Sequence, residues 1–280
     1  MNARRIRPSL WIALALFGAV CASPAGAHQF WLTPTGYTLG VGQTVAIGAA
    51  AGTGFRGERK PWSPAHSVRF VARTSRTIDL ARAASPGDFQ WARFAPSDEG
   101  GAMIGFESTF TPIELPSTAF DAYLEEEGLS VARAARARAS RATAGRERYR
   151  RCAKVWLSGR DGARATAALG FPVEIVPQGI PGTTASLSVA VLREGRPLSG
   201  ALVKAWRFSL GAGNAPVDVS ARDSVAVTWQ GRTDARGLAW VPVRTAGEWL
   251  VSVVDMVPSR VQAEADWEST WASLTFEQTR

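Results

Sequence analysis

Two histidines, His28 and His66, are the residues of this chain whose type and position point most directly to chemistry. If His28 becomes the first residue of a processed protein, its α-amine and its imidazole Nδ1 can bind one metal ion in a chelate ring. Nitrogen donors of this kind favour copper and nickel over zinc or manganese. His66 precedes a predicted strand and could supply a further nitrogen, whereas Phe30 at the third position excludes an amine–amide–imidazole chelate. The alternative is two ordinary surface histidines.

This metal hypothesis depends on how the N-terminus is processed. Three arginines precede the apolar run Leu10–Val20, and Ala-Gly-Ala at positions 25–27 offers the small residues that a signal peptidase recognises. The apolar run is too short for a membrane span, which needs roughly 20 apolar residues. We therefore expect residues 1–27 to be a cleaved signal peptide and the mature protein to be periplasmic or secreted, with no transmembrane span.

Charge and cysteine content narrow the partners of such an exported chain. Removing residues 1–27 takes away three arginines and no acid, so the balance stays basic, from +8 for the full chain. Eight arginines crowd the segment from Arg133 to Arg151. We interpret them as a solvated helix face, with an acidic partner as the alternative and nucleic acid as no expected partner. Only Cys152 remains after processing, so no intramolecular disulfide can form, and we expect it to be a buried filler.

Two further motifs are rejected on their context. Gly52–Gly57 matches the dinucleotide pattern G-x-G-x-x-G, but a polar Glu-Arg-Lys-Pro sequence follows it instead of a helix, so we predict a loop. Glu125–Glu127 is a run of three acids, and consecutive residues cannot share one helix face. We predict no catalytic residue and no organic cofactor.

The hydrophobic pattern predicts a mainly β protein of two β-sandwich domains, immunoglobulin-like or prealbumin-like. The first domain spans residues 28–178 and the second, which looks prealbumin-like, spans residues 179–280. Helical spacing after Pro116 predicts a helical insertion over residues 118–152. The predicted strands of the first domain are Gln29–Leu32, Thr44–Ile47, Ser67–Ala72, Gln90–Phe94, Ala102–Phe106 and Ala153–Leu157. Those of the second are Ser186–Leu192, Ala201–Phe208, Val225–Trp229, Leu238–Val243, Glu248–Met256 and Trp271–Phe276.

Short runs along almost the whole mature chain resemble one family, the domain of unknown function 4198. They include His28-Gln29-Phe30-Trp31-Leu32, Gly54-Phe55-Arg56-Gly57-Glu58, Phe120-Asp121-Ala122-Tyr123-Leu124 and Asp266-Trp267-Glu268-Ser269-Thr270-Trp271.

The resemblance implies a periplasmic protein, similar to periplasmic components of cobalt or nickel uptake systems, that binds metal through its N-terminal histidine. The family often has a histidine before Met256, where this chain has Asp255. Carried over to that position, Asp255 becomes a third candidate ligand, although a carboxylate weakens the preference for copper or nickel.

The leading hypothesis is a non-enzymatic protein that binds nickel, cobalt or copper through His28, with His66 and Asp255 as further candidates, and that delivers metal to a membrane uptake system. A copper-dependent oxidative enzyme is the rival, because polysaccharide mono-oxygenases also combine an N-terminal histidine with a second histidine on a β-sandwich. A metal-free envelope module that binds carbohydrate or protein is the third possibility.

Overall fold

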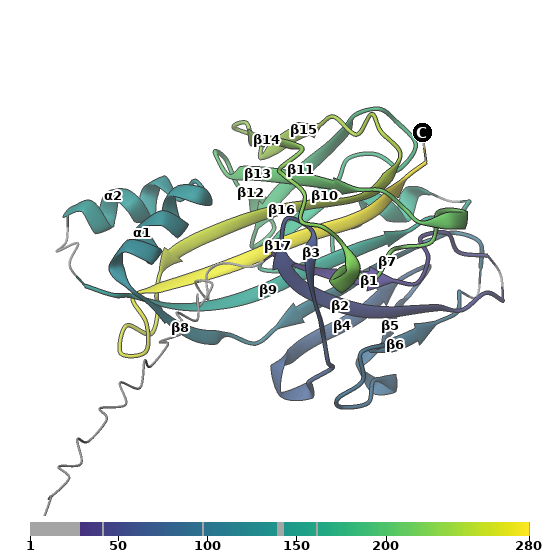
Figure 1. The fold of residues 1–280 in the computed structure, drawn as a ribbon, viewed down its shortest axis with the longest axis horizontal. Coiled ribbons are helices and arrows are strands. Elements are labelled where there is room, and N and C mark those ends of the chain that lie inside the picture. The colour runs from purple at the N-terminus through teal and green to yellow at the C-terminus, as the bar shows by residue number, and fades with distance from the viewer. Residues whose placement is uncertain (1–28, 41, 97, 139–142, 161, 280) are drawn as a thin grey trace, which may run out of the picture.

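The structure is a computed structural model, and it describes residues 29–279 apart from 41, 97, 139–142 and 161. Strands dominate the described part, which confirms the mainly β prediction (Figure 1). They form three sheets: two of four strands and one of nine. Among the described residues, no helix is both long and apolar enough to cross a membrane.

The nine-stranded sheet runs through the middle of the molecule in the order β14-β13-β16-β17-β9-β7-β4-β5, with β8 also paired to β9. Among its described strands, the only parallel pair is β9 with β17. The strands are β4 (Ser67–Arg73), β5 (Thr77–Asp79), β7 (Ala102–Ser108), β8 (Thr111–Leu115), β9 (Gly145–Leu157), β13 (Leu202–Phe208), β14 (Trp229–Arg232), β16 (Gly247–Pro258) and β17 (Trp267–Gln278).

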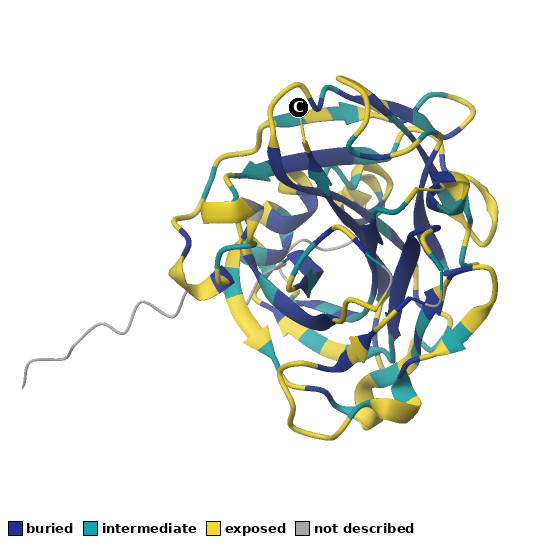
Figure 2. Ribbon diagram, turned by 90° about the vertical axis from the view of Figure 1, so that its right-hand side faces the viewer, coloured by how far each residue is buried: buried dark blue, intermediate teal, exposed yellow. Residues whose placement is uncertain are grey.

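Two smaller sheets cover the two faces of this large sheet. Side chains that alternate along β9 pack against different small sheets. Ala153 and Val155 pack with the small sheet described first below, whereas Cys152 and Trp156 pack with the other. The first contains β1 (Gln29–Pro34), β2 (Val45–Thr53), β3 (Arg56–Lys60) and β6 (Ala92–Phe94). The second contains β10 (Val173–Pro177), β11 (Leu187–Arg193), β12 (Arg196–Pro197) and β15 (Leu238–Val241). The buried residues accordingly concentrate between the layers (Figure 2).

The predicted domain boundary near residue 178 falls inside a continuous structure. β10 and β11 lie on either side of it and pair along Val173–Pro177. The large sheet also joins strands from both sides, because β17 pairs with β9 from Trp267 to Thr275. The two predicted units therefore share one sheet, which a hydrophobic pattern read locally along the chain cannot reveal.

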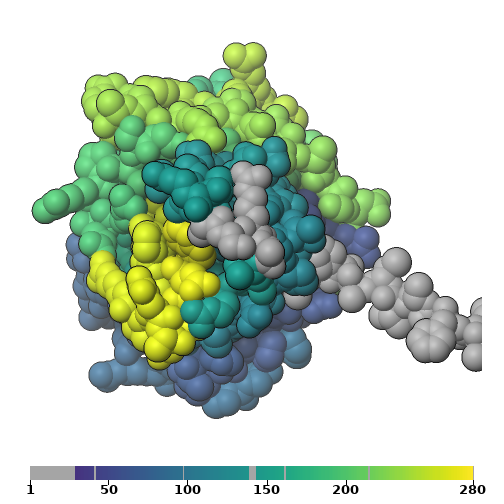
Figure 3. Space-filling model, turned by 90° about the vertical axis from the view of Figure 1, so that its left-hand side faces the viewer, coloured from purple at the N-terminus to yellow at the C-terminus, as the bar shows by residue number. Residues whose placement is uncertain are grey.

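Helices α1 (Ser117–Glu126) and α2 (Ser130–Arg138) lie within the predicted insertion. They sit beside the end of the β16–β17 hairpin (Figure 3), where Phe120, Tyr123 and Leu124 join a buried cluster with Met256 and Trp271. The predicted helical insertion is wrong over Arg146–Cys152, because this segment belongs to strand β9. Five short 3₁₀ turns complete the described part: Pro64–His66, Ala81–Ala83, Gly162–Thr166, Ala212–Asn214 and Val219–Ala221.

The arginines of this segment explain the error. Arg146, Arg148 and Arg150 alternate with a period of two and project from the same face of β9. Each meets a partner 120 residues away: Asp266, directly before β17, at 2.7 Å, and Glu268 and Thr270 on β17 at 2.7 Å and 3.0 Å. They form a cross-strand ladder and not a solvated helix face.

Two smaller predictions have clear outcomes. The loop predicted over Gly52–Gly57 is shorter than expected: only Gly54 and Phe55, with φ values of 60° and 63°, lie between β2 and β3, and the other four residues belong to these paired strands. A Cβ at Gly52 would lie 1.9 Å from the carbonyl oxygen of Arg56, so glycine is required there. Cys152 is buried, and burial raises the pKa of its thiol to about 12, as expected of a filler and not of a reactive thiol.

Candidate functional site: an aromatic cavity beside His66

His66 lines a cavity of about 390 Å³ at one edge of the molecule. It is the last residue of a 3₁₀ turn, Pro64–His66, directly before β4, and it is exposed to solvent. Its backbone holds it in place, because its N–H donates to the carbonyl of Ser63 at 3.1 Å and its carbonyl accepts from Thr109 at 3.2 Å. The other principal lining residues are Phe30, Trp62, Trp91, Phe106, Tyr149 and Arg151.

A cluster of aromatic rings forms the wall of this cavity. The ring centroids of Trp91 and Phe106 are 4.8 Å apart, those of Trp62 and Trp91 5.2 Å, and those of Phe30 and Phe106 5.5 Å. The Trp91 indole N–H donates to the carbonyl of Lys60 at 2.8 Å. Such close packing, edge-to-face for the two pairs that involve Trp91, fixes the orientation of the rings, so the wall is preorganised.

Arg151 and Tyr149 bring polar atoms to the same cavity from strand β9. The Arg151 guanidinium lies between two rings, 5.2 Å from the centroid of Phe30 and 5.0 Å from that of Tyr149. Burial lowers the pKa of Arg151, while the nearby Tyr149 opposes that shift. The cavity therefore offers one imidazole, one phenol and one stacked guanidinium within an aromatic wall.

Asp255 lies elsewhere. On β16 it is in register with Thr270, which is in register with Arg150 on β9, so these three side chains share one face of the large sheet. Arg151, the next residue along β9, must point to the opposite face, toward the cavity of His66. Four strand spacings, about 19 Å, also separate β16 from β4.

The Asp255 carboxylate is already engaged, in an ion pair with Arg193 at 3.2 Å. Burial raises the pKa of Asp255, and the Arg193 guanidinium opposes that shift. The structure therefore does not bring Asp255 and His66 together. His28, the third predicted ligand, lies outside the described residues. Within the described part of the chain, histidine, cysteine and acidic side chains form no group of three or more that could hold a metal ion.

Sequence reasoning found His66 by its type but missed Tyr149 and Arg151. The signal was present, because residues 147, 149 and 151 alternate with arginines in a pattern of period two. A helix over Arg146–Cys152 would scatter these side chains over its surface, whereas a strand sends Tyr149 and Arg151 to one face.

Comparisons with known proteins add a family. The family described as "Domain of unknown function (DUF4198)" matches residues 25–256. No curated protein matches the sequence. A solved structure, the "D0-D1 domain of Intimin", is 12% identical over 90% of this chain and 98% of that chain, with a TM-score of 0.20. A likeness at that score carries no argument about fold or function.

Proposed function

This chain belongs to the DUF4198 family, and we propose that it is a periplasmic protein that binds nickel, cobalt or copper for delivery to an uptake system. In this proposal residues 1–27 are removed on export, and the new N-terminus is the first metal ligand. The α-amine and imidazole of His28 chelate the ion, and His66 contributes a further nitrogen. Nitrogen donors suit these three metals. The described residues that line the cavity include no carboxylate.

The observation that carries the proposal is that the start of β1 lies at the cavity of His66. Gln29 is the first residue of β1, and Phe30 already lines the cavity. In the sequence, Phe30 follows His28 by two positions, and consecutive Cα atoms are ~3.8 Å apart. Asp255 is not a ligand of the same ion in this proposal, because it faces the other side of the sheet.

We expect the processed protein to bind Ni²⁺, Co²⁺ or Cu²⁺ in a one-to-one ratio, measured by equilibrium dialysis or by native mass spectrometry. One extra alanine before His28 converts the α-amine into an amide and destroys the chelate. Both this extension and His66→Ala should weaken binding by at least about 10–100-fold, the range found when even an outer-shell contact to a metal ligand is removed. Asp255→Asn is the matched control and should bind as the wild type does. Equal binding by the extended and processed forms would overturn the proposal.

A copper-dependent oxidative enzyme is the second candidate, favoured by Tyr149. Tyr149 lines the same cavity as His66, and a phenol oxygen near a copper ion can act as a weak axial ligand. In that case the copper-loaded protein with ascorbate should produce hydrogen peroxide, and Tyr149→Phe should change that rate without abolishing copper binding. A copper-loaded protein that produces no peroxide above the rate of its His66→Ala variant would exclude this activity.

We further propose that the chain contains two sandwich units of residues 28–178 and 179–280, the second of prealbumin type, which share the large sheet. The first core combines residues of β1, β2, β4 and β7. The second combines residues of β11, β13, β15, β16 and β17 with residues of β7, β9 and β10 from the first unit. The first core supports the proposal, because its described members all fall within residues 28–178 and lie on one face of the shared sheet.

A further inference from the structure

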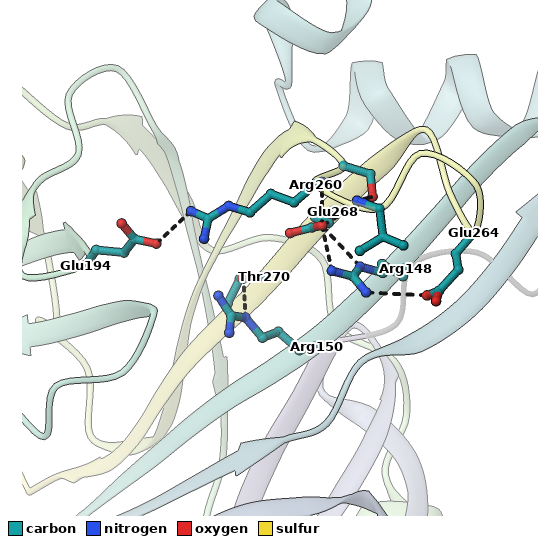
Figure 4. Close-up of polar contacts among 9 residues, drawn as sticks. Arg148, Arg150, Glu194, Arg260, Glu264, Glu268 and Thr270 are labelled. Atoms are coloured by element: carbon teal, nitrogen blue, oxygen red, sulfur yellow. Dashed lines mark hydrogen bonds and ion pairs between the residues drawn. The ribbon is translucent and has the colours of Figure 1, made fainter.

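A second cavity, of about 470 Å³, lies on the opposite face of the large sheet from His66. Arg148 and Arg150 project into it from β9, and Glu194 approaches from the sheet across it (Figure 4). Apolar side chains complete its walls, among them Phe110, Val173 and Val257. We call it the arginine cleft, because four arginines line it: Arg148, Arg150, Arg193 and Arg260.

Three of these arginines have a carboxylate partner that also lines the cleft. The pairs are Arg148 with Glu268 at 2.7 Å, Arg193 with Asp255 at 3.2 Å, and Arg260 with Glu194 at 3.2 Å. Glu264 also reaches Arg148 at 3.4 Å, but its side chain is 64% exposed, where water screens its charge. The described residues that line the cleft therefore carry four positive and three negative charges, an excess of one positive charge.

Arg150 carries that excess charge. Its Nε donates to the hydroxyl of Thr270 at 3.0 Å, and its guanidinium lies 4.8 Å from the centroid of the Phe110 ring. Its nearest carboxylate in the described structure is Glu107 at 3.8 Å, which is bound more closely by Arg69 at 2.7 Å. The hydroxyl and the ring hold Arg150 in position without neutralising it. Figure 4 shows its two terminal nitrogens pointing away from β9, toward the side that carries Glu194.

We propose that the arginine cleft binds a small organic carboxylate. The carboxylate accepts two hydrogen bonds from the terminal nitrogens of Arg150, the bidentate geometry that a guanidinium fork favours. The apolar body of the ligand packs against Phe110, Val173 and Val257. One carboxylate balances the one excess positive charge, whereas a metal cation would meet four arginines. The cleft lies within the size range of small-molecule sites, roughly 300–1,000 Å³.

The test uses the full processed chain and 3-phenylpropanoate as the probe, titrated by isothermal calorimetry with and without EDTA. Two matched probes separate the parts of the argument. 3-Phenylpropan-1-ol has the same apolar body without the charge, and inorganic phosphate has charge without the body. We expect saturable one-to-one binding of 3-phenylpropanoate that EDTA leaves unchanged, and at least about tenfold weaker binding of both matched probes.

Variants then locate the binding. Arg150→Gln should weaken binding of 3-phenylpropanoate by at least about tenfold, because it removes a charge-assisted pair. Arg146→Gln is the matched control: it belongs to the same ladder but pairs with Asp266 and does not line the cleft. It should bind as the wild type does. Val257→Trp should block binding by filling the space while leaving every arginine in place, so it decides the question if Arg150→Gln fails to fold.

Three results would overturn the proposal. They are no saturable binding of 3-phenylpropanoate, equal binding by the wild type and Val257→Trp, and binding of phosphate or the alcohol as tight as that of the carboxylate. Because EDTA removes any bound metal, failure here is distinct from failure of the His28–His66 site.

Discussion

Replacing Arg222 with methionine is expected to lower the free energy of unfolding by about 3–5 kcal/mol, the usual cost of removing one partner of a buried ion pair. Arg222 is 2% exposed, and its guanidinium donates to Glu248 Oε2 at 2.6 Å. It also lies between the rings of Phe55 and Phe208, at 4.7 and 4.8 Å from their centroids. Methionine fills similar space but leaves the Glu248 carboxylate buried without its cation.

The expected effect is large because few other groups stabilise the buried Glu248 carboxylate. Burial raises its pKa, and the Arg222 charge is the largest influence that opposes the shift. The hydroxyl of Tyr37 still donates to Glu248 Oε1 at 2.6 Å. Burial also raises the pKa of that phenol, so it stays a protonated donor at neutral pH. One neutral hydrogen bond cannot replace a buried guanidinium.

Urea denaturation followed by tryptophan fluorescence measures this loss. The double variant Arg222→Met with Glu248→Gln removes both charges and should recover part of the stability, because no uncompensated ion remains. Arg82→Gln is the control, since its pair with Asp79 is exposed, and it should change stability by less than about 1 kcal/mol. A loss below about 1 kcal/mol in Arg222→Met would contradict the prediction.

The strands were predictable because half-buried strands alternate in a pattern that the sequence displays directly. β1, β4, β7, β11 and β16 begin within two residues of their predicted starts. What joins them was not predictable from local pattern. The parallel pairing of β9 with β17 joins residues 120 apart. The role of the β9 arginines could not be predicted, because their partners Asp266 and Glu268 come beside them only in the folded protein.

The candidate site shows the same limit. His66 could be chosen by residue type alone. Tyr149 was missed because its segment was predicted to be helical. The choice between a helical period and a strand period of two decides which side chains lie on one face and can meet. Asp255 came from a family position, and the pleat of β16 sends it to the arginine cleft instead of the cavity of His66.

Glu147 should make the stability of this protein depend on pH. It is 2% exposed near the start of β9, and its Oε1 accepts hydrogen bonds from the hydroxyls of Tyr123 and Ser269. Burial raises the pKa of Glu147 to about 7, and the Ser269 and Tyr123 hydroxyls and the Arg151 charge oppose that shift only in part. The folded protein therefore holds a proton on Glu147 at pH values where the unfolded chain, with an ordinary carboxyl pKa, has released it.

The sign follows from this difference. A carboxyl with a raised pKa in the folded state gives full stability below its unfolded pKa, and that stability is lost as pH rises to about 7. The contribution lost is about 3 kcal/mol, because the pKa of about 7 in the folded protein lies well above the ordinary carboxyl value of 4.5. Glu147→Gln cannot titrate, so its stability relative to the wild type should rise by about that amount between pH 4 and pH 8. Comparing how the free energy of unfolding changes with pH removes any constant packing cost of the amide. As a control, Glu114→Gln, at an exposed position on β8, should leave the pH dependence of the wild type unchanged. Parallel pH profiles for the wild type and Glu147→Gln, measured by urea denaturation at each pH, would contradict the prediction, because they would mean that Glu147 has an ordinary pKa in the folded protein.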